Sequence, residues 1–262
     1  MTNMAVVFDM DETLGSFQQL YKFWVLTCSF LNKNDLADIY FFTIVDNFPL
    51  FLRPDFNKIL KSLKKLKLNN ICSNVMIYTN NNGPNEWANI IKRYLNHIVK
   101  YELFDNIIRA FKINGKQIEI CRTSYGKSYK DFISCTKLPT NTKVCFIDDI
   151  YHEEMIHDNV FYINIEPYHH NEDYMKLCEF FYRRHHTLFF GLSLEKYKKY
   201  IFNNTYNHNL NHLNKSSLQK NIEYLLTGEI LKMINEFFKD STSKKTCKNK
   251  TYISKNKTKK QR

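Results

Sequence analysis

The amino-acid sequence predicts an α/β fold with a central, mostly parallel sheet flanked by helices. Three short apolar runs, at residues 5–8, 74–78 and 143–147, have the length and composition of strands that are covered on both faces. Residues 86–101, between the second and third runs, carry apolar side chains at helical spacing. Because strands that alternate with helices pair in parallel, we expect the polar residues that follow the runs to meet at one edge of the sheet.

The first run delivers two carboxylates, Asp9 and Asp11, to the edge where open α/β sheets bind ligands. An Asp-x-Asp pair taken alone is more often a solvated turn. The apolar residues before it and Thr13 after it instead favour a site for phosphoryl transfer assisted by a divalent cation. The next segment, residues 15–51, is rich in Phe, Tyr, Trp and Leu and is expected to be helical.

The second run ends in Thr79 and Asn80, and residues 81–86 then have the turn chemistry and the acidic residue that open a helix. A Thr beside a helix N-terminus can hold a phosphate, although a strand-end Thr taken alone is more often structural. The other elements expected around this point are a packing helix at 86–101, a strand at 104–111, a turn at 112–116, a helix from 130 to 135 and a strand at 160–165.

The third run ends in two adjacent acids, Asp148 and Asp149, which would complete a cation site at the same edge. Ligand sets of carboxylate oxygens and water suit Mg²⁺. An isolated Asp pair is more often a helix cap or a turn, but its place after a third buried run favours the metal site. His152 follows in a loop that should border the site, yet a surface or structural role is the more common one for such a histidine.

The chain after residue 168 is expected to be helical, with helices at 175–182, 194–202 and 218–238. We therefore divide the chain into a catalytic domain with a helical insert, a helical C-terminal extension and a basic tail, at residues 1–168 (insert 15–52), 169–240 and 241–262.

The tail holds nine Lys and Arg and no acid, and so carries most of the net charge of +12. Such tails bind polyanions through counterion release. An acidic phosphoprotein or nucleic acid is the expected partner, with a nuclear address or simple solubility as the alternatives.

Composition limits the function class and the compartment. The six glycines form neither a G-x-x-x-x-G-K-[ST] nor a G-x-G-x-x-G phosphate loop. The seven cysteines lack C-x-x-C pairs, which argues against a zinc site or a disulfide framework and for a reducing compartment. Neither a signal peptide nor a membrane span is evident, so we expect an intracellular protein, cytoplasmic or nuclear. The abundance of Asn, Lys, Ile and Tyr is typical of an AT-rich genome, such as that of a large DNA virus or a protist.

The pattern around Asp9 and Asp11 resembles the first motif of the haloacid dehalogenase superfamily, and the strand ends at Thr79 and at Asp148-Asp149 resemble its second and fourth motifs. The resemblance implies a HAD-like Rossmannoid fold and a Mg²⁺-dependent phosphomonoester hydrolase. It assigns Asp9 as the nucleophile that forms an aspartyl-phosphate and Asp11 as the acid/base. It also implies that Thr79 and Asn80 bind phosphate and that the metal is held by Asp9, Met10, Asp11, Asp148 and Asp149.

The family also has a lysine that neutralises the phosphate, and two residues compete for this role. Lys127 lies just before a possible Ser128 cap at the spacing typical of the superfamily, whereas Lys130 lies in a Lys-Asp-apolar string that resembles one subfamily. A separation of three residues would place both on one helix face. Either could also be a solvated lysine, so both remain candidates.

That subfamily is the NLI-interacting-factor-like phosphatases, which include the small phosphatases of the RNA polymerase II C-terminal domain. Residues 9–14, 52–60 and 146–149 carry the resemblance, which covers about residues 4–168. It implies phosphoserine or phosphothreonine of a protein as the substrate. The helical insert departs from the strand-rich insert of the polymerase phosphatases. A small-molecule or nucleic-acid-end phosphatase, or a catalytically silent binding module, therefore remain alternatives.

Overall fold

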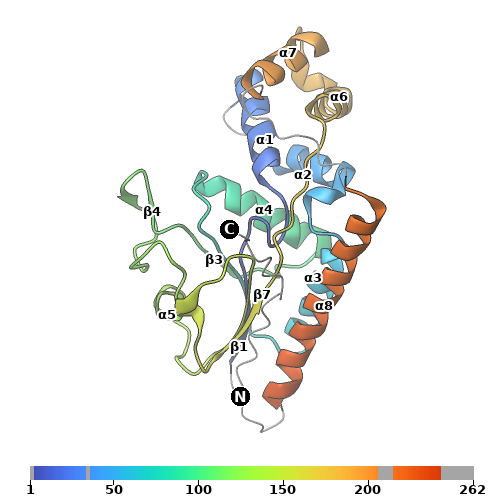
Figure 1. Cartoon of the computed structure of the whole chain (residues 1–262). Coiled ribbons are helices and arrows are strands. Elements are labelled where there is room, and N and C mark those ends of the chain that lie inside the picture. Colours follow the sequence, from blue (N-terminus) through green and yellow to red (C-terminus); the bar gives the residue numbers. More distant parts are fainter. Residues whose placement is uncertain (1–2, 34–35, 206–214, 243–262) are drawn as a thin grey trace, which may run out of the picture.

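The computed structural model describes residues 3–33, 36–205 and 215–242. The sheet, drawn edge-on at the centre of Figure 1, has five strands, and every neighbouring pair is parallel. The predicted α/β fold with a central sheet flanked by helices is therefore confirmed. In spatial order the strands are β3 (Asn106–Ile108), β2 (Asn74–Tyr78), β1 (Met4–Phe8), β6 (Lys143–Asp148) and β7 (Val160–Asn164).

Strand β1 is the middle strand, and its sequence explains why. The residues Ala5–Phe8 are all fully buried, as expected for a strand with neighbours on both edges and helices on both faces. Its side chains alternate between two apolar clusters, with Val6 and Phe8 in the larger and Val7 in the smaller.

Helices form one layer on each face of the sheet. The larger cluster lies under α3 (Phe56–Leu68), α4 (Asn85–Val99) and α8 (Ser217–Thr242), and the smaller one under α5 (Tyr129–Thr136). The arrangement is that of a doubly wound sheet, whose ligand sites lie beyond the carboxyl ends of the strands.

The insert and part of the C-terminal extension combine into one helical lobe, drawn at the top of Figure 1. It contains α1 (Gln18–Phe30) and α2 (Asp38–Asn47) from the insert, and α6 (Tyr174–Arg184) and α7 (Leu194–Thr205) from the extension. Phe23 of α1 contacts the rings of Phe181 and Tyr197 at centroid distances of 6.4 and 6.5 Å. The hydroxyls of Thr27 and Tyr197 share a hydrogen bond of 2.6 Å. The extension is thus not one unit, because α8 returns to the sheet.

The apolar residues of α8 are only partly buried. Ile230, Ile234 and Phe237 pack in the main core, whereas Ile222 and Leu225 are 44% and 70% exposed. Short 3₁₀ turns complete the main chain at Pro49–Phe51, Glu153–Met155 and His186–Phe189.

The expected strand at 104–111 is shorter than predicted, and the expected turn at 112–116 is a hairpin. The ladder of β3 ends before Arg109, because the Arg109 amide donates to Glu119 at 3.3 Å and its carbonyl accepts from Arg122 at 2.8 Å. Strands β4 (Lys112–Ile113) and β5 (Lys116–Gln117) then pair antiparallel. Asn114 and Gly115, with φ of 50° and 78°, form an Asn-Gly turn of the kind that favours hairpins.

A disulfide joins Cys121 to Cys135, contrary to the argument against a disulfide framework. The two residues are 14 apart in sequence and belong to no C-x-x-C motif. They meet because the end of α5 returns to the loop that follows the hairpin. Cys28, Cys72, Cys145 and Cys178 are not in disulfide bonds with other described residues.

The predicted basic tail at 241–262 falls largely outside the described residues. Within the described part of the chain, no helix combines the length and the apolar character needed to cross a membrane.

Candidate active site at the carboxyl edge of the sheet

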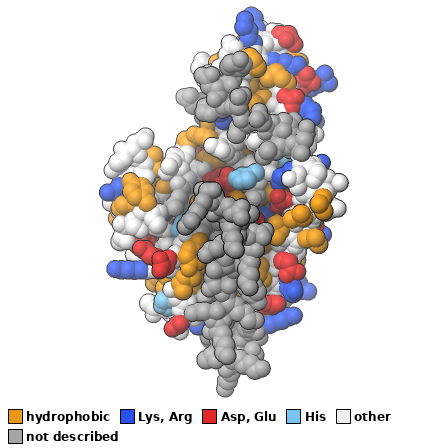
Figure 2. Space-filling model, in the orientation of Figure 1, with side chains coloured by type: hydrophobic (Ala, Val, Ile, Leu, Met, Phe, Trp, Pro, Cys, Tyr) orange, Lys and Arg blue, Asp and Glu red, His pale blue; other side chains and the backbone are white. Residues whose placement is uncertain are grey.

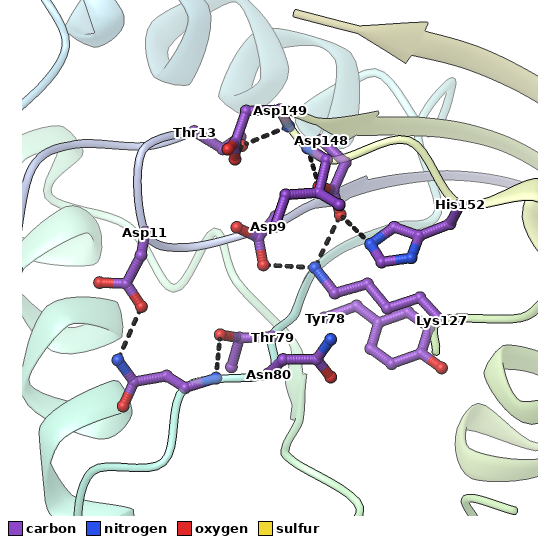
Figure 3. Close-up of polar contacts among 12 residues, drawn as sticks. Asp9, Asp11, Thr13, Tyr78, Thr79, Asn80, Lys127, Asp148, Asp149 and His152 are labelled. Atoms are coloured by element: carbon purple, nitrogen blue, oxygen red, sulfur yellow. Dashed lines mark hydrogen bonds and ion pairs between the residues drawn. The ribbon is translucent and has the colours of Figure 1, made fainter. Parts of the chain in front are cut away.

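The ends of three neighbouring strands bring the predicted residues together (Figure 3). Asp9 directly follows β1, Thr79 directly follows β2, and Asp148 is the last residue of β6. The amide of Asp9 donates to the carbonyl of Ile147 at 2.9 Å, which continues the ladder to the edge. Asp9, Thr79 and Asp148 are 8%, 2% and 0% exposed, so all three are largely shielded from bulk water.

Lys127 places a buried ammonium at the centre of this group. Its Nζ donates to Oδ2 of Asp148 at 2.7 Å and to Oδ1 of Asp9 through a short hydrogen bond. The ammonium also lies 5.7 Å from the centre of the Tyr78 ring, where the negative face of the ring favours a cation. A lysine that is only 2% exposed needs such partners, because an unpaired buried charge is strongly unfavourable.

The structure chooses Lys127 over Lys130. Ser128 caps α5, and its hydroxyl accepts from the Asp131 amide at 3.1 Å, so Lys127 precedes the helix and Lys130 lies within its first turn. The rule that residues three apart share a helix face therefore does not apply to this pair. Lys130 is exposed and has no hydrogen bond or ion pair with the described residues of the site, so the structure favours Lys127 as the lysine of this site.

Three carboxylates converge beside the ammonium. One oxygen each of Asp9, Asp148 and Asp149 lies within 4.8 Å of the others. Thr13 holds Asp149 in place, because its hydroxyl donates to Oδ1 at 2.8 Å and accepts from the Asp149 amide at 3.1 Å. Oδ1 of Asp148 accepts from the amide of Ile150 at 2.8 Å. The acids are thus fixed by the local backbone before any ligand binds.

The protonation of these acids reflects burial opposed by one shared cation. Burial raises the pKa of Asp9, although Lys127 pulls it down. Burial would also raise the pKa of Asp148, but the Lys127 ammonium outweighs it and the pKa is lowered. The pKa of Asp149 is raised by burial, with Thr13 opposing the change. Burial lowers the pKa of Lys127, but the charges of Asp9 and Asp148 outweigh burial, and the pKa is raised.

Asp11 stands apart from the three acids, on the left of Figure 3. Its Oδ2 accepts a hydrogen bond of 2.6 Å from the side-chain amide of Asn81. Burial raises the pKa of Asp11, and the bond from Asn81 opposes that rise. Neither Asp11 nor Met10 belongs to the carboxylate group. Met10 has no side-chain oxygen, and its carbonyl accepts from the amide of Leu14 at 3.0 Å. Of the predicted metal ligands, the structure therefore groups the carboxylates of Asp9, Asp148 and Asp149.

Thr79 and Asn80, the predicted phosphate ligands after β2, differ in exposure and in hydrogen bonding. Thr79 is buried and its hydroxyl accepts from the amide of Asn81 at 3.0 Å. Asn80 is exposed, and its Oδ1 accepts from NH1 of Arg122 at 2.8 Å. Both side chains lie below Asp9 and Lys127 in Figure 3.

Arg122 is the main residue that the sequence did not reveal. It is 1% exposed and also donates to the carbonyls of Arg109, Tyr125 and Gly126 at 2.8, 3.1 and 3.0 Å. These acceptors come from separate segments, and carbonyls leave no sequence signal. Thr13 and Asn81 were visible in the motifs, but no role was predicted for them.

A second buried arginine holds the loop after Asp9. Arg53 is 1% exposed and donates to the carbonyls of Glu12, Thr13 and Glu166 at 2.8, 2.9 and 2.8 Å. Its role is therefore structural. Glu12, whose φ is 57°, is kept in this uncommon left-handed conformation by those bonds, and burial raises its pKa to about 7.

His152 borders the site, as expected for the loop after Asp149. Its Nε2 lies 3.5 Å from Oδ2 of Asp148, and its amide donates to the hydroxyl of Tyr162 at 2.8 Å. His152 therefore contacts Asp148 but is not part of the group formed by Asp9, Asp148 and Asp149.

The donor set fits a hard divalent cation. Asp9, Asp148 and Asp149 supply oxygens only, which is the ligand type of Mg²⁺, and the single ammonium of Lys127 cannot balance three carboxylates. Comparisons of the chain with protein-family models, curated proteins and solved structures found no match.

Proposed function

We propose that this chain is a Mg²⁺-dependent phosphomonoester hydrolase of the haloacid dehalogenase type that works through a phospho-Asp9 intermediate. The observation that carries the proposal is the Lys127 ammonium held between Asp9 and Asp148 at the carboxyl edge of a parallel sheet. A carboxylate nucleophile attacks a phosphate dianion only where nearby cations neutralise both anions.

Asp9 is the nucleophile in this proposal. One of its oxygens attacks phosphorus in line with the leaving oxygen, and the P–O bond to the leaving group breaks as the aspartyl-phosphate forms. Lys127 contacts Asp9 directly and supports the anionic form that attack requires. Thr79 and Asn80 lie beside it at the end of β2 and are placed to donate to phosphate oxygens.

Asp11 is the acid/base. Its pKa is raised by burial, so the carboxyl group keeps its proton to a higher pH than an ordinary Asp. The protonated form can donate to the leaving oxygen. In the second half-reaction the same carboxylate takes a proton from the water that hydrolyses the acyl phosphate. The amide of Asn81, 2.6 Å from Oδ2, fixes the direction in which the other oxygen points.

Asp9, Asp148 and Asp149 would hold the Mg²⁺. When bound, the ion supplies positive charge for the phosphate oxygens and for Asp9. Thr13 and Ile150 position the carboxylates of Asp149 and Asp148 for that role.

We further propose a phosphoserine or phosphothreonine protein as the substrate, as the family resemblance implies. A small-molecule substrate is the second candidate, favoured by the helical lobe of α1, α2, α6 and α7, since such lobes can act as lids that exclude bulky substrates. Phosphopeptides, nucleotides and end-phosphorylated oligonucleotides assayed side by side would separate these.

The decisive experiment is phosphate release from an aryl phosphate, with Mg²⁺ or with chelator, for the wild type and Asp9→Asn. Asp158→Asn serves as the control, because Asp158 is exposed and lies outside the site. Metal-dependent turnover that is lost only in Asp9→Asn supports the proposal, and turnover retained by Asp9→Asn contradicts it. If no protein turns over, beryllofluoride bound at Asp9 indicates a selective enzyme, and its absence indicates a binding module.

A further inference from the structure

Arg122 joins three segments beside the proposed phosphate site. Its guanidinium donates to the side chain of Asn80, to the carbonyl of Arg109 after β3 and to the carbonyls of Tyr125 and Gly126. Gly126 immediately precedes Lys127. The same guanidinium lies 4.9 Å from the centre of the Tyr78 ring. A planar group with five fixed donors is suited to hold several acceptors in one geometry.

The contact with Asn80 determines which end of its carboxamide faces the site. Arginine has donors only, so the atom of Asn80 that lies 2.8 Å from NH1 must be the carbonyl oxygen Oδ1. The Nδ2 group is then directed the other way, and Figure 3 shows the nitrogen end of Asn80 on the side of Lys127. Asn80 is exposed, so its side chain is not covered by the rest of the protein.

The main chain around Arg122 is anchored on both sides. Cys121 is joined to Cys135 of α5 by the disulfide. Thr123 donates to Asp131 of α5 twice, from its amide and its hydroxyl, at 2.9 Å each. These bonds fix the main chain at Arg122 relative to α5. Helix α5 begins directly after the Ser128 cap, which follows Lys127.

We propose that Arg122 is a positioning residue that makes Asn80 a hydrogen-bond donor to phosphate, by holding the carboxamide oxygen away from the ligand. The proposal deepens the proposed function and rests on phosphate occupying the site beside Lys127. Without Arg122 the carboxamide can rotate, and its oxygen can then face a phosphate oxygen and repel it.

The test is the affinity for inorganic phosphate, measured by calorimetry with saturating Mg²⁺, in parallel with KM and kcat for an aryl phosphate. Asn80→Ala removes the donor and should weaken phosphate binding and raise KM by about five- to tenfold, as expected for one hydrogen bond to a charged group at an exposed position. Arg122→Met should have a similar effect. The double variant should be no weaker than the poorer single variant, because both changes remove the same bond.

Two variants guard against a merely structural explanation. Arg122→Lys retains a cation over Tyr78 but lacks the planar fork, so it should fold and still bind phosphate less tightly than the wild type. Arg93→Met is the matched control, because Arg93 pairs at the surface with Asp38 and Glu86 and should leave phosphate affinity unchanged.

The outcomes separate the inference from the proposed function. Phosphate binding that depends on Arg122 and Asn80 without additivity supports the inference even if no ester is turned over, a result that would overturn only the proposed function. Wild-type affinity in Asn80→Ala or Arg122→Lys, additive losses in the double variant, or no phosphate binding by the wild type would each overturn the inference.

Discussion

Nζ of Lys127 lies 2.7 Å from Oδ2 of Asp148, and both side chains are almost completely buried. The same ammonium donates to Asp9, so one cation is shared by two acids at the end of adjacent strands. Because Lys127 lowers the pKa of Asp148 while the pKa of Asp9 stays raised, the ammonium alone does not secure an ionised Asp9. A second cation is therefore expected to complete the site.

Lys127→Met should lower both the turnover and the melting temperature. Turnover of an aryl phosphate should fall by about 100- to 1,000-fold, as for loss of one charge-stabilising donor, and the melting temperature should drop because two buried carboxylates lose their partner. Lys130→Met is the control, since Lys130 is exposed on α5. Equal effects of the two variants would show that Lys127 has no special role.

Mg²⁺ should stabilise the folded protein through the three converging acids. At a concentration 100-fold above the dissociation constant, the gain in free energy of unfolding should be about 2.7 kcal/mol. In Asp149→Asn this gain, measured by thermal unfolding with and without Mg²⁺, should largely disappear. A wild-type response in Asp149→Asn would remove Asp149 from the metal site, whereas Asp158→Asn should respond like the wild type.

The Cys121–Cys135 disulfide should contribute to stability and to the phosphate site. Closing a loop of about 15 residues stabilises a fold by about 3 kcal/mol in the chain-entropy model. Reduction by a dithiol, which converts the disulfide to two thiols as the dithiol is oxidised, should lower the free energy of unfolding and weaken phosphate binding through Arg122. The Cys121→Ser/Cys135→Ser variant should show both effects and no further response to the dithiol. A dithiol response of the same size in this variant would assign the effect to another cysteine.

Glu12 should make stability depend on pH in the absence of metal. Its pKa rises from 4.5 to about 7 in the folded protein because of burial and the nearby Asp11 and Asp149. The folded state therefore binds more protons than the unfolded state between these values, and stability falls as pH rises through the interval. Because Glu12 is partly exposed, solvent screening reduces the effect. We expect the free energy of unfolding of Glu12→Gln to exceed that of the wild type by about 1 kcal/mol at pH 8.5 and by much less at pH 5. Urea unfolding in chelator measures this, and a difference that does not depend on pH would contradict it.

The sequence predicted the parts of the site that lie at strand ends. Asp9, Thr79 and Asp148 follow or end buried apolar runs, and parallel pairing dictates that such ends meet. The choice between Lys127 and Lys130 could not be made, because it depends on where α5 begins, and the Ser128 cap settles that. Arg122 was not predicted because its acceptors are brought together only by tertiary structure.

The C-terminal helices show the same limit. The spacing of apolar residues predicted α6, α7 and α8 with little error, but spacing does not say which surface a helix meets. Rings of Phe181 and Tyr197 meet Phe23 in the insert, whereas Ile234 packs against the sheet core. These contacts divide the extension between the lobe and the core beside the sheet.

Asn81→Ala should slow chemistry without weakening substrate binding. The side-chain amide of Asn81 donates to Oδ2 of Asp11 at 2.6 Å, and its Oδ1 accepts from the backbone amide of Gly83 at 2.8 Å. The loop therefore orients the Asn81 side chain, which in turn orients the carboxylate of Asp11. Without this bond Asp11 can turn away from the leaving oxygen, and general acid catalysis contributes about 100-fold or more. We expect the rate of Asp9 phosphorylation, measured in the pre-steady state, to fall at least tenfold more for an alkyl phosphate, whose leaving group needs a proton, than for a nitrophenyl phosphate, whose leaving group does not. The later hydrolysis of the aspartyl-phosphate is common to both substrates and is kept out of this comparison. A uniform loss for both substrates would indicate general disruption of the loop instead of misorientation of Asp11.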